Sequence, residues 1–189
     1  AQSPADLVSD LYAVTGDILH KKGEEQEAFA AYDSCLQWKD DNVMALNNYA
    51  YYLSVKGTDL HKAESMSYKT IKAEPNNGTY LDTYAWILFM EERYADAKTY
   101  IDQALKNRDS TADNSTVIEH AGDIYYMNGM SDESVNFWKE AYTGENQTEV
   151  LAWKIKNRQY ITEEELKKRN APKQKVAATK KSVRKGKKK

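Results

Sequence analysis

The sequence is short of the residues that build disulfide frameworks, tight turns and membrane spans. Its 189 residues include one cysteine, three prolines and eight glycines. The single cysteine, Cys35, excludes an internal disulfide. No stretch approaches the ~20 consecutive apolar residues that a membrane-spanning helix needs. Alternating apolar runs bounded by hairpin turn signals are also missing, so the sequence predicts an all-α fold.

Signatures of catalysis are missing too. There is no glycine-rich phosphate-binding loop and no serine nucleophile motif. The three histidines, His20, His61 and His120, lack the i, i+4 spacing of a helical metal site, and we expect them at surface or groove positions. Cys35 is expected to be a small buried thiol rather than a nucleophile. These absences predict no enzyme activity, metal, cofactor or small-molecule substrate.

What the sequence does contain is a repeat of about 34 residues, the period of stacked helical hairpins. Small residues recur in four pairs whose members lie 12 or 13 residues apart. These pairs are Gly16 and Ala28, Ala50 and Ala63, Ala85 and Ala97, and Gly122 and Ser134. They divide the chain into four units, at residues 9–42, 43–77, 78–111 and 115–148. Small residues at the eighth and twentieth positions of a unit let the two helices of its hairpin approach closely.

The residues at equivalent positions resemble the tetratricopeptide repeat (TPR), whose pattern is W-x2-L-G-x2-Y, then A-x3-F, then P. The third unit matches the seven helix positions of this pattern with conservative changes. They are Leu81, Tyr84, Ala85, Leu88, Ala97, Ile101 and Ala104. Pro75 closes the second unit as the pattern requires, whereas Asp109 replaces that proline in the third. The resemblance implies a right-handed TPR superhelix, an α-solenoid of four helix-turn-helix repeats with a C-terminal capping helix.

Two further segments flank the repeats. Residues 1–8 are expected to be a lead-in. Residues 149–170 are expected to hold the capping helix and one more short helix, because a solenoid needs a polar-backed element over its last apolar face. Thr162 and Glu165 form the capping-box pattern that opens the short helix.

Glycines mark the ends of the first helices within the units. Gly23, Gly57 and Gly129 are expected to adopt the left-handed conformation that ends a helix. Glu92 takes the equivalent place in the third unit.

By resemblance to TPR arrays, the first helix of each unit lines a concave groove. We take ten residues that the register places on this groove as the candidate binding site. They are Asn47, Tyr51, Val55, Asp82, Trp86, Phe89, Met90, Glu119, Asp123 and Tyr126. The middle of the groove is aromatic and its ends are acidic. Exposed apolar patches usually mark binding sites, so we expect a non-enzymatic scaffold that binds a peptide or protein segment with apolar and basic side chains.

Two alternatives bear on this interpretation. Tyr51, Trp86 and Tyr126 can instead pack against a neighbouring helix in the core, because an aromatic stripe at helical spacing is often buried. The TPR subclass that binds the C-terminal carboxylates of chaperones uses Lys, Asn and Arg at groove positions. The largely acidic and aromatic groove of this chain disfavours that ligand class.

The last 19 residues have a different composition from the rest. Residues 171–189 hold nine basic residues and no acidic one, which leaves residues 1–170 with a net charge of −11. We expect this tail to be disordered. One interpretation is a solvated, solubilising terminus or one that folds back on the acidic solenoid. The other is a second function, tethering to a polyanion or an anionic membrane surface. The candidate residues are Lys180, Lys181, Arg184, Lys185, Lys187, Lys188 and Lys189. No aromatic residue is interleaved for base stacking, so sequence-specific nucleic-acid binding is not expected.

Two stretches of sequence indicate the lineage of the protein. The stretches ALNNYAYYLS and TYLDTYAWILF resemble those of bacterial TPR proteins, particularly Bacteroidetes-type proteins that are often exported or lipid-anchored. From this resemblance we expect the full-length protein in the bacterial cell envelope, periplasmic or membrane-anchored, with the cytoplasm as the alternative.

Overall fold

The computed structural model describes residues 2–171, which fold into ten α-helices and one short 3-10 helix without a β-strand. The helices are α1 (Pro4–Lys21), α2 (Glu25–Trp38), α3 (Val43–Lys56), α4 (Leu60–Ala73), α5 (Gly78–Met90), α6 (Tyr94–Asn107), α7 (Ser115–Met127), α8 (Ser131–Ala141), η1 (Gly144–Asn146), α9 (Glu149–Asn157) and α10 (Glu163–Asn170). Within these residues no helix is long and apolar enough to cross a bilayer.

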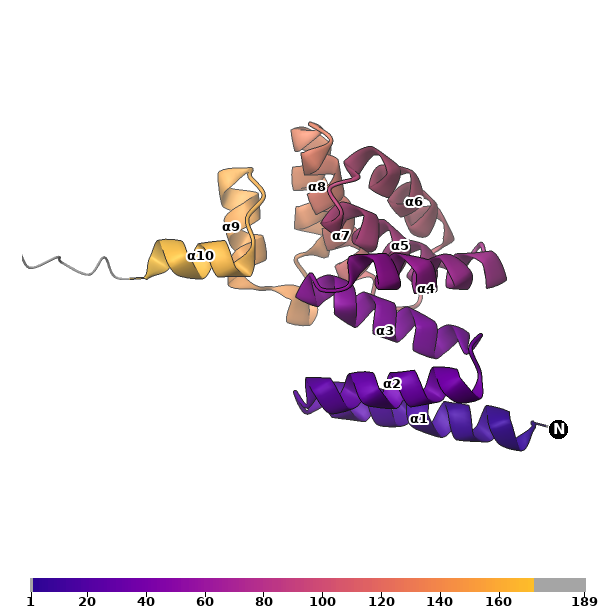
Figure 1. Ribbon diagram of the computed structural model, residues 1–189. Helices are drawn as coiled ribbons and strands as arrows, with labels where there is room; N and C mark the ends of the chain where they lie inside the picture. The colour runs from indigo at the N-terminus through magenta and orange to yellow at the C-terminus, as the bar shows by residue number, and fades with distance from the viewer. Residues whose placement is uncertain (1, 172–189) are drawn as a thin grey trace, which may run out of the picture.

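The first eight helices form four hairpins that stack in chain order (Figure 1). The most extensive contacts lie within the pairs α1–α2, α3–α4, α5–α6 and α7–α8. Helix α3 also contacts α1 and α5, and α5 contacts α7, so the first helices of successive hairpins lie next to one another. This is the stack of hairpins that the repeat predicts.

Helix α1 begins earlier than expected. It starts at Pro4, so most of the predicted lead-in at residues 1–8 is helical. The Ser3 side chain accepts a hydrogen bond from the Asp6 backbone N–H at 3.2 Å, and the Asp6 carboxylate accepts one from the Ser3 backbone N–H at 3.1 Å. This capping box, with Pro4 in the first turn, supplies the start signal that the repeat pattern alone did not reveal.

The turns between paired helices use left-handed residues as predicted. Gly57 follows α3 with φ of 69°, and Glu92 follows α5 with φ of 63°. The equivalent residues in the first and fourth units, Gly23 and Gly129, share this conformation. At this helix-ending position only the third unit has a residue with a side chain in the left-handed region, although Asp59, which precedes α4 in the second unit, is also left-handed with φ of 47°.

Close packing within a hairpin depends on the eighth position of the unit. A Cβ atom on Gly122 would lie 2.4 Å from the ring of Trp138, and one on Gly16 would lie 2.8 Å from the ring of Tyr32. Trp138 and Tyr32 are fully buried on the second helices of their hairpins. The small residues of the pattern therefore make room for an aromatic ring across the hairpin.

Neighbouring units are joined by polar side chains as well as by apolar packing. Asn42 caps α3 by accepting from the Ala45 backbone N–H at 3.1 Å. Its amide also donates to Ser9 Oγ at 3.0 Å and to Asp10 Oδ1 at 2.9 Å. Ser9 Oγ in turn lies 3.2 Å from the sulfur of Cys35, which is buried as expected. Burial raises the pKa of this thiol, so Cys35 stays protonated.

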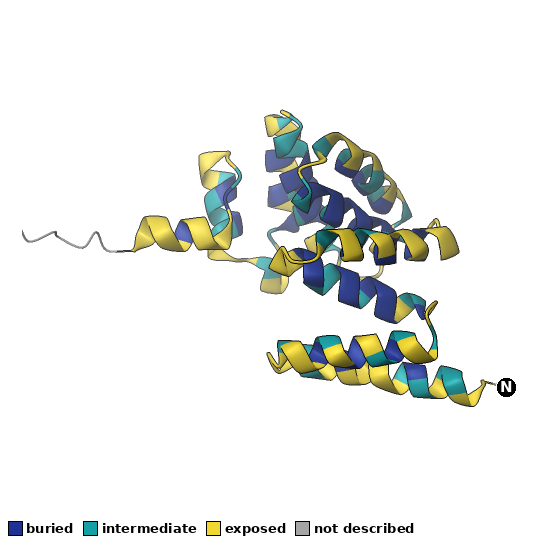
Figure 2. Ribbon diagram, in the orientation of Figure 1, coloured by how far each residue is buried: buried dark blue, intermediate teal, exposed yellow. Residues whose placement is uncertain are grey.

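The last two helices follow the fourth hairpin. Leu151 of α9 is fully buried beside Trp138 and Ile118, so α9 covers the apolar end of that hairpin. Helix α10 opens with the predicted capping box, in which Thr162 Oγ1 accepts from the Glu165 N–H and the Glu165 carboxylate accepts from the Thr162 N–H. Figure 2 shows α10 as largely exposed apart from one buried position, Leu166. We call residues 149–171 the C-terminal segment.

Candidate functional site

A cavity of about 880 Å³ lies between the groove face, formed by α3, α5 and α7, and the C-terminal segment. The groove face contributes Tyr51, Val55, Trp86, Met90, Thr116, Glu119, His120 and Asp123. The other wall includes Lys154, Tyr160, Ile161 and Leu166. Helices from three successive hairpins thus meet at one site, because the first helices of the units lie side by side.

The groove wall of this cavity is built around the indole of Trp86. The ring stacks on the imidazole of His120 with centroids 4.0 Å apart, and on Phe89 with centroids 4.7 Å apart. Tyr51 lies next to the same imidazole, at a centroid distance of 6.2 Å. Burial raises the pKa of Tyr51 to about 12, and the charge of Asp82 adds to this effect. Tyr51 is therefore a neutral phenol at physiological pH.

His120 is buried and paired with a carboxylate. Its Nδ1 lies 2.9 Å from Asp82 Oδ1, and both side chains are almost fully shielded from solvent. Burial by itself lowers the pKa of His120, but the charge and hydrogen bond of Asp82 outweigh it, with further contributions from Asp123 and Glu119. The net effect is a raised pKa, which favours an imidazolium–carboxylate pair at the back of the cavity. His120 thus lies on the groove face, one of the two places expected for it, but it is buried and paired with Asp82.

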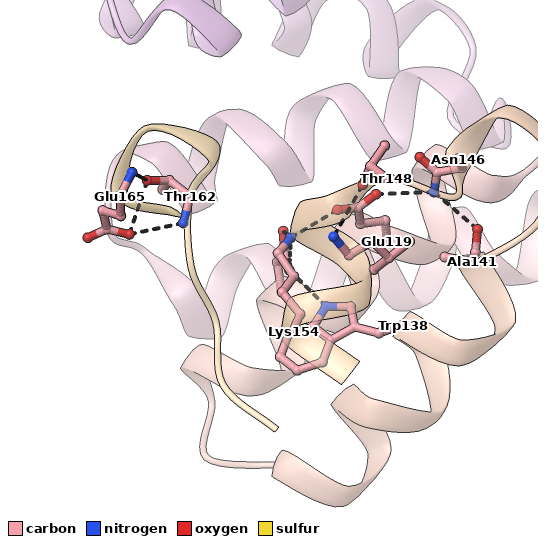
Figure 3. Close-up of polar contacts among 10 residues, drawn as sticks. Glu119, Trp138, Ala141, Asn146, Thr148, Lys154, Thr162 and Glu165 are labelled. Carbon is pink, nitrogen blue, oxygen red and sulfur yellow. Dashed lines mark hydrogen bonds and ion pairs between the residues drawn. The ribbon is translucent and has the colours of Figure 1, made fainter. Parts of the chain in front are cut away.

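A lysine from the C-terminal segment occupies the acidic end of the groove (Figure 3). Lys154 is 3% exposed, and its Nζ donates to Asp123 at 2.8 Å and to Glu119 at 2.9 Å. Trp138 Nε1 also donates to Asp123, at 2.8 Å, and Asn146 donates to Glu119 at 3.1 Å. Burial lowers the pKa of Lys154, but the two carboxylates outweigh it and raise the pKa overall. Lys154 is therefore a buried cation with its hydrogen bonds satisfied.

Three further side chains of the C-terminal segment, Tyr160, Ile161 and Leu166, also pack against the groove face. The ring of Tyr160 packs edge-on against Phe89 with centroids 5.7 Å apart, and lies 5.3 Å from Lys154 Nζ. Burial raises the pKa of Tyr160, so this phenol is also neutral. Ile161 and Leu166, both buried, complete the wall. The chain thus places one basic and three apolar side chains of its own against the groove.

The ten residues predicted for the groove fall into three groups. Tyr51, Val55, Trp86 and Met90 line the cavity and keep exposed surface, with Val55 at 58%. Asp82, Glu119 and Asp123 are already bound to His120 or Lys154. The remaining three, Asn47, Phe89 and Tyr126, lie outside the cavity lining.

Phe89 requires a correction. It is 5% exposed and belongs to the apolar core with Leu88 and Ile101, because its ring is covered by Trp86, Tyr94 and Tyr160. Asn47 is likewise buried, at 5% exposure, and Tyr126 packs against the Trp138 ring. Phe89 and Asn47 are therefore not presented to a partner, whereas Tyr126 is half-buried.

The structure also adds residues that the register did not select. His120 occupies the sixth position of its unit. This position faces the preceding hairpin, so the repeat register could have predicted that His120 contacts α5. Lys154 and Tyr160 lie outside the four units, and no repeat pattern pointed to them. No group of three or more potential metal ligands occurs within residues 2–171. The predicted polyanion-binding residues Lys180 to Lys189 lie outside the described residues.

Known proteins share both the repeat and its three-dimensional arrangement. A 66-residue stretch, 35% of this chain, is 36% identical to a TPR repeat-containing protein of Pseudomonas aeruginosa, of which it covers 11%. The structure of Pseudomonas aeruginosa PilF superposes with a TM-score of 0.69 at 16% identity, covering 82% of this chain and 69% of PilF. No protein-family model matches the chain.

A second solved structure belongs to a protein that is described as peptide-binding. YrrB, described as a TPR protein with an unusual peptide-binding site, superposes with a TM-score of 0.57 at 18% identity. The match covers 78% of this chain and 74% of YrrB. At such identities the likeness establishes the fold, and the solenoid architecture predicted from the repeat is confirmed.

Proposed function

We propose that this chain, which has the fold of tetratricopeptide-repeat proteins, is a non-enzymatic scaffold that binds a protein or peptide segment in the groove face. The segment enters the cavity between α3, α5 and the C-terminal segment. It packs on the surface offered by Tyr51, Val55, Trp86 and Met90.

The observation that supports this proposal is that the C-terminal segment of the chain itself binds in the groove. The C-terminal segment lays Lys154 on Asp123 and Glu119, and Tyr160 on Phe89. A groove that holds a lysine and an aromatic ring from its own chain has the chemistry to hold the same side chains from a partner. The unoccupied part of the groove face continues directly from this contact.

The chemistry of the lining favours a partner with apolar and basic side chains. Trp86 and Tyr51 supply rigid aromatic surface, which dominates the energetics of many interfaces. Glu163 and Glu149 also line the cavity, and both sit in the first turn of their helices. Glu163 pairs with Lys167 at 2.5 Å, but this ion pair is exposed and a cationic side chain of the partner can replace it, so electrostatics favour a basic over an acidic peptide.

A peptide-display selection against the intact chain tests the proposal. Selected sequences are expected to combine Lys or Arg with aromatic or branched aliphatic residues. Trp86→Ala is expected to weaken the binding of a selected peptide by about 2 kcal/mol, roughly thirtyfold in Kd, because a central aromatic anchor is lost. Fluorescence anisotropy with the purified variants gives the affinity.

Two further variants make the result interpretable. Val55→Asp places a charge on an exposed cavity residue and is expected to reduce binding with no loss of helical signal. Tyr68→Ser alters a similarly exposed side chain on α4, away from the cavity, and is expected to change nothing. Unchanged affinity in both Trp86→Ala and Val55→Asp would rule out the groove as the binding site.

A further inference from the structure

The outward surface of α1 carries an apolar stripe that nothing in the described chain covers. Leu7, Leu11, Val14 and Ile18 are 53%, 60%, 48% and 49% exposed. Together with Tyr12 they account for five of the nine large hydrophobic side chains that are exposed within residues 2–171. Figure 1 places α1 at one end of the stack, and Figure 2 shows little buried surface along it. Apolar surface concentrated in this way marks an interface.

The repeat register shows that the α1 stripe occupies helix-packing positions. In the later units, the third, sixth and tenth positions of the first helix face the preceding hairpin. Asn48, at a sixth position, donates to Asp17 of α1 at 3.0 Å, and Tyr52, at a tenth position, stacks on His20 of α1 at 3.5 Å. Ala45, Ile87 and Ile124 hold third or tenth positions and are fully buried.

In α1 these positions are held by Leu11, Val14 and Ile18, the last three residues of the stripe. They are therefore helix-packing residues that no helix within residues 2–171 covers. The opposite end of the stack differs, because α9 covers it and buries Leu151. The α1 stripe is built to receive an α-helix.

The spacing of the stripe favours a copy of itself as that helix. Its intervals are four, three and four residues, as in the apolar seam of a coiled coil. The stripe is also symmetric about its centre, so an antiparallel copy sets Leu7 opposite Ile18 and Leu11 opposite Val14. Each contact then occurs twice, as a two-fold interface requires.

The charges along α1 also favour an antiparallel pair. Asp6 and Asp10 lie in the first half of the helix, where Asp6 also pairs with Lys39, directly after α2, at 2.9 Å. In contrast, His20 and Lys21 lie in the last turn and Lys22 follows directly. Antiparallel pairing brings the basic end of each helix to the acidic end of the other, and it opposes the two helix dipoles. Parallel pairing would set like charges side by side. We infer that α1 pairs antiparallel with α1 of a second copy of this chain, forming a two-fold dimer across the stripe.

Light scattering after size exclusion, over a series of concentrations, tests the assembly. The full chain is expected to elute as a dimer that dissociates on dilution. Leu11→Glu combined with Ile18→Glu is expected to give a monomer with unchanged helical content, because both side chains are exposed in the single chain. Lys21→Glu combined with Lys22→Glu is expected to raise the dimer Kd by roughly tenfold at low salt. Trp86→Ala, which alters the groove, is the matched control and is expected to remain dimeric.

Oxidative cross-linking tests the direction of the helices. Leu7→Cys and Ile18→Cys chains are each expected to give no disulfide-linked dimer alone, whereas their mixture is expected to give a linked heterodimer. The native Cys35 is fully buried and does not interfere. A monomeric full chain at every concentration, a dimer that survives Leu11→Glu with Ile18→Glu, or self-linking of Leu7→Cys would each overturn the inference.

Discussion

At the scale of single residues, the groove face is unusual for the charges that it buries. Asp82, His120, Asp123 and Lys154 are each at most 7% exposed, although a charged side chain is rarely buried without a partner. Here every one has a partner within 2.9 Å. Such pairs stabilise a fold little compared with apolar packing, but removing one member leaves a buried charge alone. The site is therefore sensitive to single substitutions and to pH.

The His120–Asp82 pair predicts a pH dependence of stability. Since the folded state raises the pKa of His120 above its ordinary 6.5, the folded state binds the proton more tightly than the unfolded state. The stabilisation is complete below about 6.5 and is lost as pH rises through the folded pKa, with a slope of at most about 1.4 kcal/mol per pH unit for one proton. Urea unfolding followed by circular dichroism across this range measures the slope.

His120→Gln is the matched variant, because an amide can still donate to Asp82 but does not titrate. The slope above pH 6.5 is expected to disappear in it. An equal slope in both proteins would assign the titration to another group.

At the scale of the helical hairpin, the packing partner of the eighth position decides which small residue is allowed. Glycine stands opposite Tyr32 and Trp138, whereas the repeat register pairs Ala85 with the smaller Ile101, which belongs to the same core cluster. All three large side chains are fully buried. Different pairs of side chains are thus buried at the same position of the hairpin, which explains why the pattern tolerates both glycine and alanine.

Gly122→Ala is expected to destabilise the chain even though alanine is the better helix former. The new Cβ would lie 2.4 Å from Trp138, and overpacking of this kind costs about 1–3 kcal/mol, against a propensity gain of about 1 kcal/mol. Combining it with Trp138→Ile recreates the pair found at Ala85 and Ile101. In a double-mutant cycle the combined loss should be smaller than the sum of the single losses. A stabilised Gly122→Ala would contradict the close approach.

At the scale of the whole molecule, the C-terminal segment is both the end cap of the solenoid and one wall of its cavity. Leu151 covers the fourth hairpin, while Lys154 and Tyr160 reach the groove face from the same segment. Stability and access to the groove are therefore coupled. A partner that competes for Asp123 and Glu119 must displace Lys154.

Lys154→Met is expected to reduce the free energy of unfolding by about 3–5 kcal/mol, because Asp123 and Glu119 lose their cation. Adding Asp123→Asn removes the stranded charge while leaving an oxygen to accept from Trp138, and most of the loss should be recovered. Chemical denaturation measures both values. Hydrogen exchange in α9 and α10 should rise in the single variant, and unchanged protection there would argue against Lys154 as the anchor of the segment.

The sequence by itself determined the repeat and therefore the fold, because helix period, small residues at fixed positions and turn glycines are local signals. Gly57, Glu92 and the Thr162–Glu165 capping box behave as predicted, since each acts within a few residues of chain. The tertiary structure alone decided which groove residues remain open. Lys154 and Tyr160 reach the groove from outside the repeats, and Phe89 is covered by rings from three other residues. Burial and ion pairing are long-range contacts, and no periodicity along the chain encodes them.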